Sequence, residues 1–286
     1  MAITGMMKVL EENFLLSLSP TITVSTNDAD KVNMYDLDND TIWASIGSDD
    51  LTEETIEIDY GASFNVTRIH LMGINWKKYK IEAWDGSAWQ AIDIDDSDLS
   101  SVYGQAVYGN SEYGNTTIDF EHNNLTSRYF EIDVTTQKLL ITISTTITAD
   151  EEKQITELYI GAEIGTFVAD LTSSPNSYTP TPINSNAIML MKSNAGTRRF
   201  NRGSKYRGSF RIRQLWDDAD RTLVQNMYLT GSFVIFPSGG SRFYEDFGFR
   251  IDDFYHVVWD GDFSNPFAVG RVKEIGVDIA FDLVEQ

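Results

Sequence analysis

The side chains that could do chemistry in this sequence are mostly carboxylates, with a few scattered histidines. The three histidines have no spacing typical of a metal site: His70, His122 and His256. No G-x-S-x-G elbow is present, and Ser238-Gly239-Gly240-Ser241 is not followed by the lysine of a phosphate-binding loop. Carboxylates are so abundant that pairing any two as acid and base has no support without geometry. We therefore predict that the protein is not an enzyme.

The acidic run Asp36-x-Asp38-x-Asp40 has the spacing of the first three ligands of an EF-hand. Thr41 stands where that loop needs glycine, however, and Gly47 where it needs glutamate. The pattern therefore excludes an EF-hand but leaves a cluster of hard oxygen donors.

Two further segments are candidates for binding. A tyrosine-glycine pair recurs every five residues, at Tyr103, Tyr108 and Tyr113. Tyrosines on glycine-rich loops are typical of contact surfaces, because they give a large area at low entropic cost. We predict that these three stack on a sugar or pack on a neighbouring subunit; the alternative is a rim loop that packs on itself.

The second segment is strongly basic. Seven of the 22 Lys and Arg residues of the chain fall within residues 198–213: Arg198, Arg199, Arg202, Lys205, Arg207, Arg211 and Arg213. Interleaved aromatics would suit nucleic acid, but the acidic first half of the chain would repel a polyanion. We predict an interface with an acidic protein surface, such as a neighbouring copy. The alternative is a hairpin with solvated arginines.

Composition narrows the classes further. The chain has 286 residues, a net charge of -21, 42% hydrophobic residues and no cysteine. Disulfides and thiolate metal sites are therefore excluded, and non-specific binding of nucleic acid is not expected. No stretch reaches the roughly 18 apolar residues of a spanning helix, and Glu11 and Glu12 precede the first apolar run where an export signal needs positive charge. We expect no membrane insertion.

The charge is divided unevenly along the chain. Residues 1–164 contain 9 Lys and Arg against 29 Asp and Glu, whereas residues 165–286 contain 13 against 14. This shift predicts two domains, with a boundary in a stretch rich in Pro, Ser and Thr. The expected parts are an N-terminal arm (1–19), a β-sandwich (20–164), a linker (165–186) and an assembly module (187–286). The alternative to the linker is a long loop inside one domain.

The first half shows a period of two. Thr55–Tyr60 places Ile56, Ile58 and Tyr60 on one face, and Tyr79–Trp84 leads through Asp85-Gly86 to Trp89. Asp-Gly between aromatic runs indicates a hairpin, because glycine supplies the positive φ of a tight turn. Many short strands and almost no amphipathic helix predict a sandwich or barrel.

An ordered set of landmarks in this half resembles discoidin-type domains, also called coagulation factor 5/8 C-type or galactose-binding-like domains. The quoted segments, from roughly residue 20 to 162, are 33–43, 56–61, 69–71, 79–87, 128–132 and 155–161. The resemblance implies an eight-stranded antiparallel jelly-roll sandwich. It also implies loops at one end that bind glycans, lipid headgroups or proteins.

The same resemblance implies a structural calcium ion. Its ligands would be the Asn33 carbonyl, Asp36, Asp38, the Thr41 hydroxyl and Glu157. Leu37 stands where the family usually has glycine, which puts the backbone of this loop in doubt. The alternative is a solvated acidic loop with Trp43 filling the core.

The second half predicts a β-rich α+β module. Strands are expected at 186–191, 209–213, 232–236, 254–259 and 275–283, with one short helix over 217–228 buried through Leu223, Val224 and Met227. In style this half resembles structural modules of phage tail tips and baseplates.

These observations predict a mainly β, non-catalytic virion protein of a bacteriophage tail: a tail-tip, baseplate or fibre-attachment component. It would assemble in the host cytoplasm as a homo-oligomer with other tail proteins, and its sandwich would face a host surface glycan or a neighbouring protein. The alternative is a carbohydrate-binding adhesin or an accessory glycan-binding module.

Overall fold

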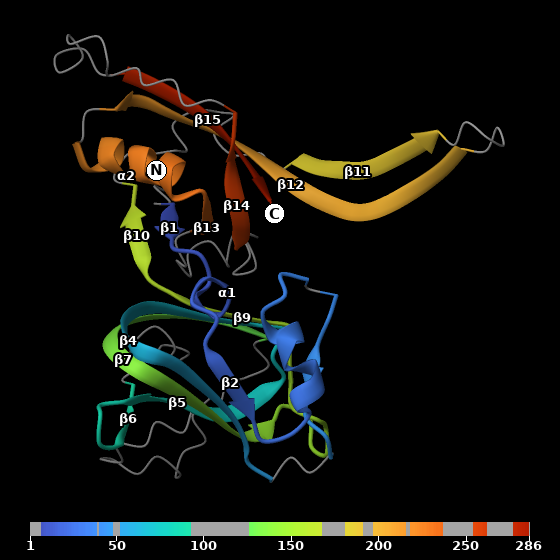
Figure 1. The fold of residues 1–286 in the computed structure, drawn as a ribbon, viewed down its shortest axis with the longest axis vertical. Coiled ribbons are helices and arrows are strands. Elements are labelled where there is room, and N and C mark those ends of the chain that lie inside the picture. Colours follow the sequence, from blue (N-terminus) through green and yellow to red (C-terminus); the bar gives the residue numbers. More distant parts are fainter. Residues whose placement is uncertain are drawn as a thin grey trace, which may run out of the picture. The chain divides into compact units, whose positions relative to one another are not determined.

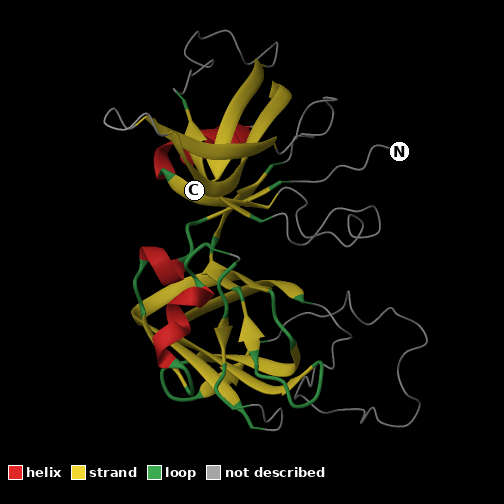
Figure 2. Cartoon of the chain, turned by 90° about the vertical axis from the view of Figure 1, so that its right-hand side faces the viewer, coloured by secondary structure: helices red, strands yellow, loops and turns green. Residues whose placement is uncertain are grey.

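The chain folds into two compact units. The computed structural model describes residues 7–38, 40–47, 52–92, 126–167, 181–190, 197–215, 218–236, 254–261 and 277–285. One unit, here called the C-terminal unit, comprises Met1–Glu11, Ile164–Ser241 and Asp253–Gln286. The other, the sandwich unit, comprises Glu12–Glu163 and Arg242–Asp252. Both are built mainly from antiparallel strands, as predicted, with few helices (Figure 2).

The sandwich unit is organised by two unusually long strands. Its described elements are α1 (Phe14–Ser17), β2 (Thr21–Val24), the 3-10 helix η1 (Asp28–Met34), β3 (Trp43–Ala44), β4 (Glu54–Met72), β5 (Trp76–Trp84), β6 (Trp89–Ala91), β7 (Ser127–Thr146), β8 (Gln154–Ile155) and β9 (Glu157–Gly161). The main sheet has the order β2-β4-β7-β5-β6, while β9 pairs with β4, and β3 with β8 (Figure 1).

Strands β4 and β7 each serve two parts of this unit. The first part of β4, around Ile56 and Ile58, pairs with both β2 and β7. After a register shift between Asp59 and Phe64, the second part of β4 pairs with β7 and β9. Such irregularities bend strands, so one pair of long strands contributes to both sides of the core.

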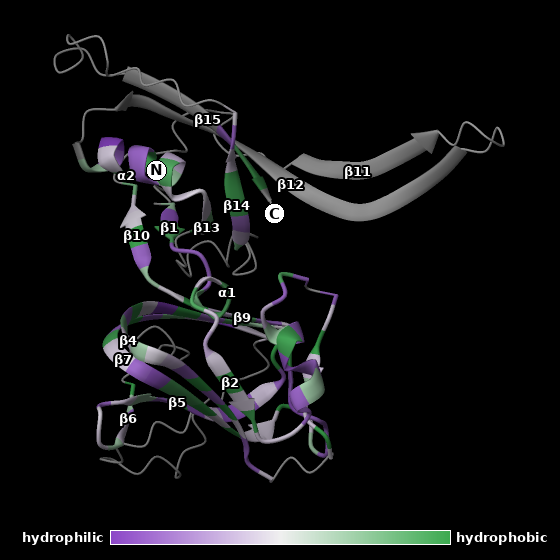
Figure 3. Cartoon of the chain, in the orientation of Figure 1, coloured by the Kyte–Doolittle hydropathy of each residue, from purple (hydrophilic) through white to green (hydrophobic). Residues whose placement is uncertain are grey.

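Alternation of burial confirms the period read from the sequence. Ile56 and Ile58 are fully buried and Tyr60 nearly so, while Glu57 and Asp59 between them are partly exposed. The same alternation of hydrophobic and hydrophilic residues is visible along these strands in Figure 3. Trp43 and Trp76 are also fully buried in this core, which agrees with Trp43 as a core residue.

The expected N-terminal arm (1–19) contains two ordered elements. Residues Lys8–Leu10 form β1, which pairs with a strand of the C-terminal unit. Asn13 then caps α1: its Oδ1 accepts from Leu15 N at 3.1 Å, and its Nδ2 donates to the Leu158 carbonyl at 2.8 Å. Asn13 is fully buried, so this segment is part of the folded units and does not extend freely.

The C-terminal unit is one seven-stranded sheet with a helix. Its order is β10-β1-β13-β14-β15-β12-β11. The bounds are β10 (Glu163–Thr166), β11 (Thr181–Leu190), β12 (Thr197–Leu215), α2 (Asp218–Thr230), β13 (Ser232–Phe236), β14 (Tyr255–Asp260) and β15 (Val277–Glu285). The end of β10 and the start of β11 lie within the predicted linker, whose residues 168–180 are outside the described part.

Helix α2 confirms the predicted buried stripe. Leu223, Val224 and Met227 are buried, and they pack in one cluster with residues of the sheet that include Phe233 and Leu283. No helix in the described ranges is long and apolar enough to cross a membrane.

Strand β12 is paired differently along its length. In the described part of the sheet, residues 207–215 pair with β15, whereas residues 197–206 pair with β11 and no other strand, and β11 is one of the two edge strands. Together β11 and the first part of β12 form a two-stranded ribbon that extends away from the other strands of this sheet (Figure 1). We call residues 181–190 and 197–206 the β-arm.

Candidate binding sites on the sandwich unit

The acidic loop after η1 is held in place by buried anchors. Met34 and Trp43 are fully buried at its two ends. The Trp43 indole Nε1 donates to the Asn27 carbonyl at 3.2 Å, and the Asn33 amide donates to the Ile42 carbonyl at 3.0 Å. The loop between them is therefore tied at its base, with its carboxylates toward solvent.

Within this loop, three of the predicted ligands lie together. The Thr41 hydroxyl is 2.8 and 3.0 Å from the two carboxylate oxygens of Asp36, and 2.9 Å from the Asp38 carbonyl. The Asp38 carboxylate instead accepts from Asp40 N at 3.0 Å. Asp38 thus meets this group through its backbone, and Asn33 uses its side chain at the loop base.

Glu157 reaches the same loop from β9. Its Oε2 accepts from Leu37 N at 3.3 Å, while its Oε1 is buried with no hydrogen-bond partner among the described residues. Burial raises the pKa of Glu157 to about 9; the charge of Asp36 adds to the rise and the Leu37 N–H opposes it. A buried carboxylate with an unsatisfied oxygen is costly unless it is protonated or meets a cation.

The oxygen atoms at this loop are of the kind that a hard divalent cation prefers, but few of them carry a negative charge. Carboxylate, hydroxyl and carbonyl oxygens are the ligands that calcium prefers. Among the described residues, however, no three His, Cys, Asp or Glu side chains converge as a metal-binding group. A cation at this loop would therefore depend on Asp36 and Glu157 together with neutral oxygens. Leu37 adopts φ +64°, the left-handed conformation that its usual glycine would favour.

A second candidate site lies on the β5–β6 hairpin, which the sequence predicted from Asp85-Gly86. The strands pair Trp84 with Trp89 directly across the turn. Asp85 Oδ1 accepts from Ser87 N and Ala88 N, both at 2.8 Å, and Gly86 has φ +101°. These N–H groups hold the pKa of Asp85 well below its usual range, so its carboxylate stays ionised and exposed.

The two tryptophans form a partly exposed aromatic pair. Their ring centroids are 5.3 Å apart at 66°, and both side chains are half-buried. Beside them the exposed Gln90 donates to Asp85 Oδ2 at 2.8 Å. The hairpin therefore presents two indole rings, a carboxylate and an amide within a few residues of one another.

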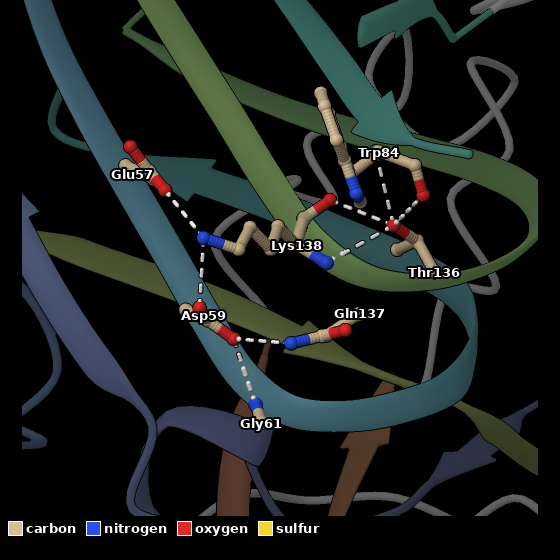
Figure 4. A network of polar contacts seen from close by, with 7 residues as sticks. All are labelled: Glu57, Asp59, Gly61, Trp84, Thr136, Gln137 and Lys138. Carbon is tan, nitrogen blue, oxygen red and sulfur yellow. Dashed lines mark hydrogen bonds and ion pairs between the residues drawn. The ribbon is translucent and has the colours of Figure 1, made fainter. Parts of the chain in front are cut away.

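Thr136 fixes the backbone beneath this hairpin, as Figure 4 shows. Its hydroxyl accepts from Trp84 N and Lys138 N, each at 3.1 Å. The same hydroxyl donates toward the carbonyls of Trp84 and Lys138, at 3.0 and 2.7 Å. Thr136 is almost fully buried, so these hydrogen bonds hold Trp84 from the core side.

Lys138 in the same network bridges two acids of β4. Its Nζ lies 2.8 Å from Asp59 Oδ2 and 3.2 Å from Glu57 Oε1. Hydrogen bonds to Asp59 and Glu57 raise the pKa of Lys138, and the bond from Lys138 is the main cause of the lowered pKa of Asp59. Because these groups are exposed, this network orders the surface and contributes little stability.

The other predicted site residues are placed only in part. Tyr103, Tyr108 and Tyr113 lie outside the described residues. All seven predicted interface residues lie on β12. Arg198, Arg199, Arg202 and Lys205 stand in the β-arm, whereas the register places Arg207 and Arg211 opposite β15.

Sequence reasoning identified the hairpin but missed its tryptophans as a site. The available signal was two tryptophans four residues apart on either side of the Asp-Gly turn. Such a spacing puts them in cross-strand positions, where aromatic side chains meet.

Comparison with known proteins gives similarity of fold alone. No family model matches the chain, and no curated protein does. Solved structures of carbohydrate-binding modules match about half of it. The CpGH89CBM32-6 module produced by Clostridium perfringens is 18% identical, covering 53% of this chain and 99% of its own, with a TM-score of 0.38.

Two modules of a chitosanase/glucanase from Paenibacillus sp. IK-5 match similarly. Chitosan-binding module 1 is 15% identical, covering 52% of this chain and 98% of its own, with a TM-score of 0.37. Chitosan-binding module 2, solved with chitotriose, is 13% identical, covering 51% and 99%, with a TM-score of 0.37.

Proposed function

We propose that the protein is a non-catalytic glycan-binding protein, and that the sandwich unit holds the sugar at the β5–β6 hairpin. The observation that carries this proposal is the half-buried pair of Trp84 and Trp89 beside the exposed Asp85 and Gln90. This arrangement differs from the loop of Tyr103, Tyr108 and Tyr113 that the sequence suggested, which lies outside the described residues.

The chemistry of this hairpin suits a sugar. An indole ring offers a large apolar face that packs against the C–H face of a pyranose ring. A carboxylate and an amide beside it can hydrogen-bond the sugar hydroxyls and so fix orientation. Because Thr136 holds the backbone of Trp84 and the turn holds Asp85, little ordering is required on binding.

A structural calcium ion at the acidic loop is a second part of the proposal. Asp36 and Glu157 would supply carboxylates, Thr41 a hydroxyl, and Asp38 a carbonyl. The buried, unpartnered Oε1 of Glu157 supports this assignment. When bound, the ion would supply the positive charge that this buried carboxylate lacks and would tie the loop to β9.

Binding at the hairpin is tested by titrating the purified chain with chitotriose, galactose and N-acetylglucosamine in a calorimeter. We expect at least one of these sugars to bind, and Trp84→Ala or Trp89→Ala to weaken its binding about 10-fold or more. Trp→Phe at either position should retain part of the affinity. The matched control is Leu229→Ala, which removes an exposed apolar side chain from α2.

Two outcomes would overturn the proposal. One is unchanged affinity in folded variants of both tryptophans. The other is release of shorter products from a glycan, which would replace a binding protein by an enzyme.

The tail-protein assignment is a separate proposal that rests on the sequence. It places the protein in a virion, with tail proteins and further copies as partners, and it is compatible with glycan binding at a host surface. Its test is co-purification of the chain with virions.

A further inference from the structure

The β-arm has fewer strand partners than the rest of its sheet. Among the described residues, residues 197–206 of β12 pair with β11 and with no other strand, and β11 is an edge strand. A two-stranded ribbon is marginally stable on its own in water. An extended ribbon of this kind therefore gains stability when it packs against another surface.

The composition of the β-arm indicates the character of that surface. Residues 181–190 and 197–206 contain four cations and no acidic residue, in a chain whose net charge is -21. The cations are Arg198, Arg199, Arg202 and Lys205. Apolar and aromatic residues, among them Ile188, Phe200 and Tyr206, are interleaved with them. The fitting partner is a surface that is both acidic and partly apolar.

The sandwich unit carries such a surface. Residues 12–163 contain 8 Lys and Arg against 28 Asp and Glu. In the described part of this unit, the exposed large hydrophobic residues are Val32, Ile42 and Ile46, with exposed fractions of 50%, 45% and 66%. They stand on two adjoining segments, because Asn33 donates to the Ile42 carbonyl and Asn27 to the Ala44 carbonyl.

Acidic residues surround these three on the same segments. Five exposed carboxylates lie there: Asp28, Asp30, Asp36, Asp38 and Asp40. The one cation between residues 26 and 46 is Lys31, which pairs with Asp28 at 2.7 Å. We call Val32, Ile42 and Ile46 with Asp28 and Asp30 the acidic patch; the other three carboxylates belong to the loop discussed above.

We propose that the β-arm of one copy docks on the acidic patch of a second copy, so that the protein self-associates. Aromatic and aliphatic residues of the arm would cover the apolar centre, and its cations would meet the acidic rim. The opposite charges would set orientation and speed of encounter, while the apolar contact would supply most of the affinity. This contact does not depend on sugar binding.

Charge exchange between the two surfaces tests the proposal. Wild-type protein is followed by light scattering and analytical ultracentrifugation from about 1 to 100 µM, at low salt and at about 0.5 M salt. We expect association that weakens about 10-fold at high salt. The arm variant Arg198→Glu/Arg199→Glu/Arg202→Glu should associate about 100-fold more weakly. Replacing the same three residues by Lys keeps the charge and should preserve association.

Rescue distinguishes an interface from misfolding. The patch variant Asp28→Arg/Asp30→Arg should also fail to associate alone, but an equimolar mixture with the arm variant should form mixed dimers or larger complexes. Ile42→Ser/Ile46→Ser should weaken association, whereas Leu229→Ser, an equally exposed apolar change on α2, should not.

Three results would overturn the proposal. The first is a wild-type protein that stays monomeric at 100 µM and low salt. Binding of an anionic polysaccharide by the arm of such a monomer would assign the arm to that other partner. The second is wild-type association by the folded arm variant. The third is absence of mixed complexes although both charge variants are folded. Each of these leaves sugar binding at the β5–β6 hairpin to be judged by its own titration.

Discussion

The two units use their long strands in opposite ways. In the sandwich unit, β4 has partners on both sides at both of its ends, and its alternating apolar residues enter one core. In the C-terminal unit, β12 pairs with β11 along residues 197–207 and with β15 along residues 207–215, so among the described residues each part of this strand has a single partner. A strand with partners on both sides builds a core, whereas one with a single partner leaves an edge and a face for another molecule.

Charge follows the same division. The sandwich unit carries a large acidic excess, while the β-arm carries cations without any acid. Self-repulsion within a strongly acidic unit lowers its stability, so such a unit gains when a cation or a basic partner meets it. Calcium at the acidic loop would reduce this repulsion within one sandwich unit. The β-arm of a second copy would reduce it between copies.

The largest expected effect is the difference in the free energy of unfolding between a buried and an exposed substitution. Trp76 is fully buried in the sandwich unit, with Tyr79 5.6 Å away. Trp76→Ala should lower the free energy of unfolding by about 3–5 kcal/mol, because it removes a large buried side chain and leaves a cavity. Urea unfolding followed by circular dichroism measures this. Leu229→Ala on α2, where the side chain is 70% exposed, should change it by less than about 0.5 kcal/mol.

An equal effect of the two substitutions would contradict the division between buried framework and exposed surface. It would mean that Leu229 is covered in solution, which would point to an interface on α2.

Local patterns in the sequence predicted the framework well. The strand at 232–236, the helix over 217–228 and the Asp85-Gly86 hairpin are observed within a few residues, and the strand predicted at 55–60 is the first part of the longer β4. Each depends on residues close in sequence: alternating apolar side chains, a buried stripe, or a glycine that permits positive φ.

What the sequence could not predict depends on pairing between distant segments. β1 pairs with β13 through Lys8 and Phe236, more than two hundred residues apart, so the first residues read as an arm. Asn13 is polar, yet it is buried because distant β9 supplies its partners. The long β12 read as a short strand at 209–213, because its arginines and glycines interrupt the apolar alternation.

The structure brings three of the predicted calcium ligands to one loop, and the calcium site itself stays a prediction. The Thr41 hydroxyl contacts the Asp36 carboxylate, and Glu157 accepts a hydrogen bond from Leu37 N. The use of the Asp38 carbonyl in place of its carboxylate follows from local backbone geometry that residue types do not reveal.

The next prediction concerns the charge inside the sandwich unit. The folded-state pKa of Glu157 is raised to about 9, so the folded protein binds this proton more tightly than the unfolded chain. Without calcium, the stability that Glu157 contributes should therefore be fully present below about pH 4 and should be lost as the pH rises toward 9, by a few kcal/mol for this group. Urea unfolding at pH 5, 7 and 9 measures the slope.

Calcium and Glu157→Gln sharpen this test. About 1 mM calcium should raise stability at pH 8 and flatten the slope, because a bound cation favours the ionised carboxylate. Glu157→Gln should remove both the slope and the calcium effect, since its neutral amide cannot titrate. A wild-type slope and calcium response in this variant would assign both to other groups and would end the proposal for this loop.

The smallest expected effect is a change in the free energy of unfolding when Leu37 in the acidic loop is replaced. Leu37 has φ +64°, which costs a residue with a side chain about 1–2 kcal/mol, while glycine there costs about 0.5–1 kcal/mol in entropy of the unfolded chain. Leu37→Gly should therefore raise the free energy of unfolding by up to about 1 kcal/mol, and Leu37→Val should lower it by at least as much. Thermal unfolding of both variants, with and without calcium, measures this.

Because Leu37 N is the group that binds Glu157, relieving the strain should also tighten calcium binding. If Leu37→Gly is instead less stable than wild type, the partly buried leucine side chain contributes more by packing than its backbone loses by strain.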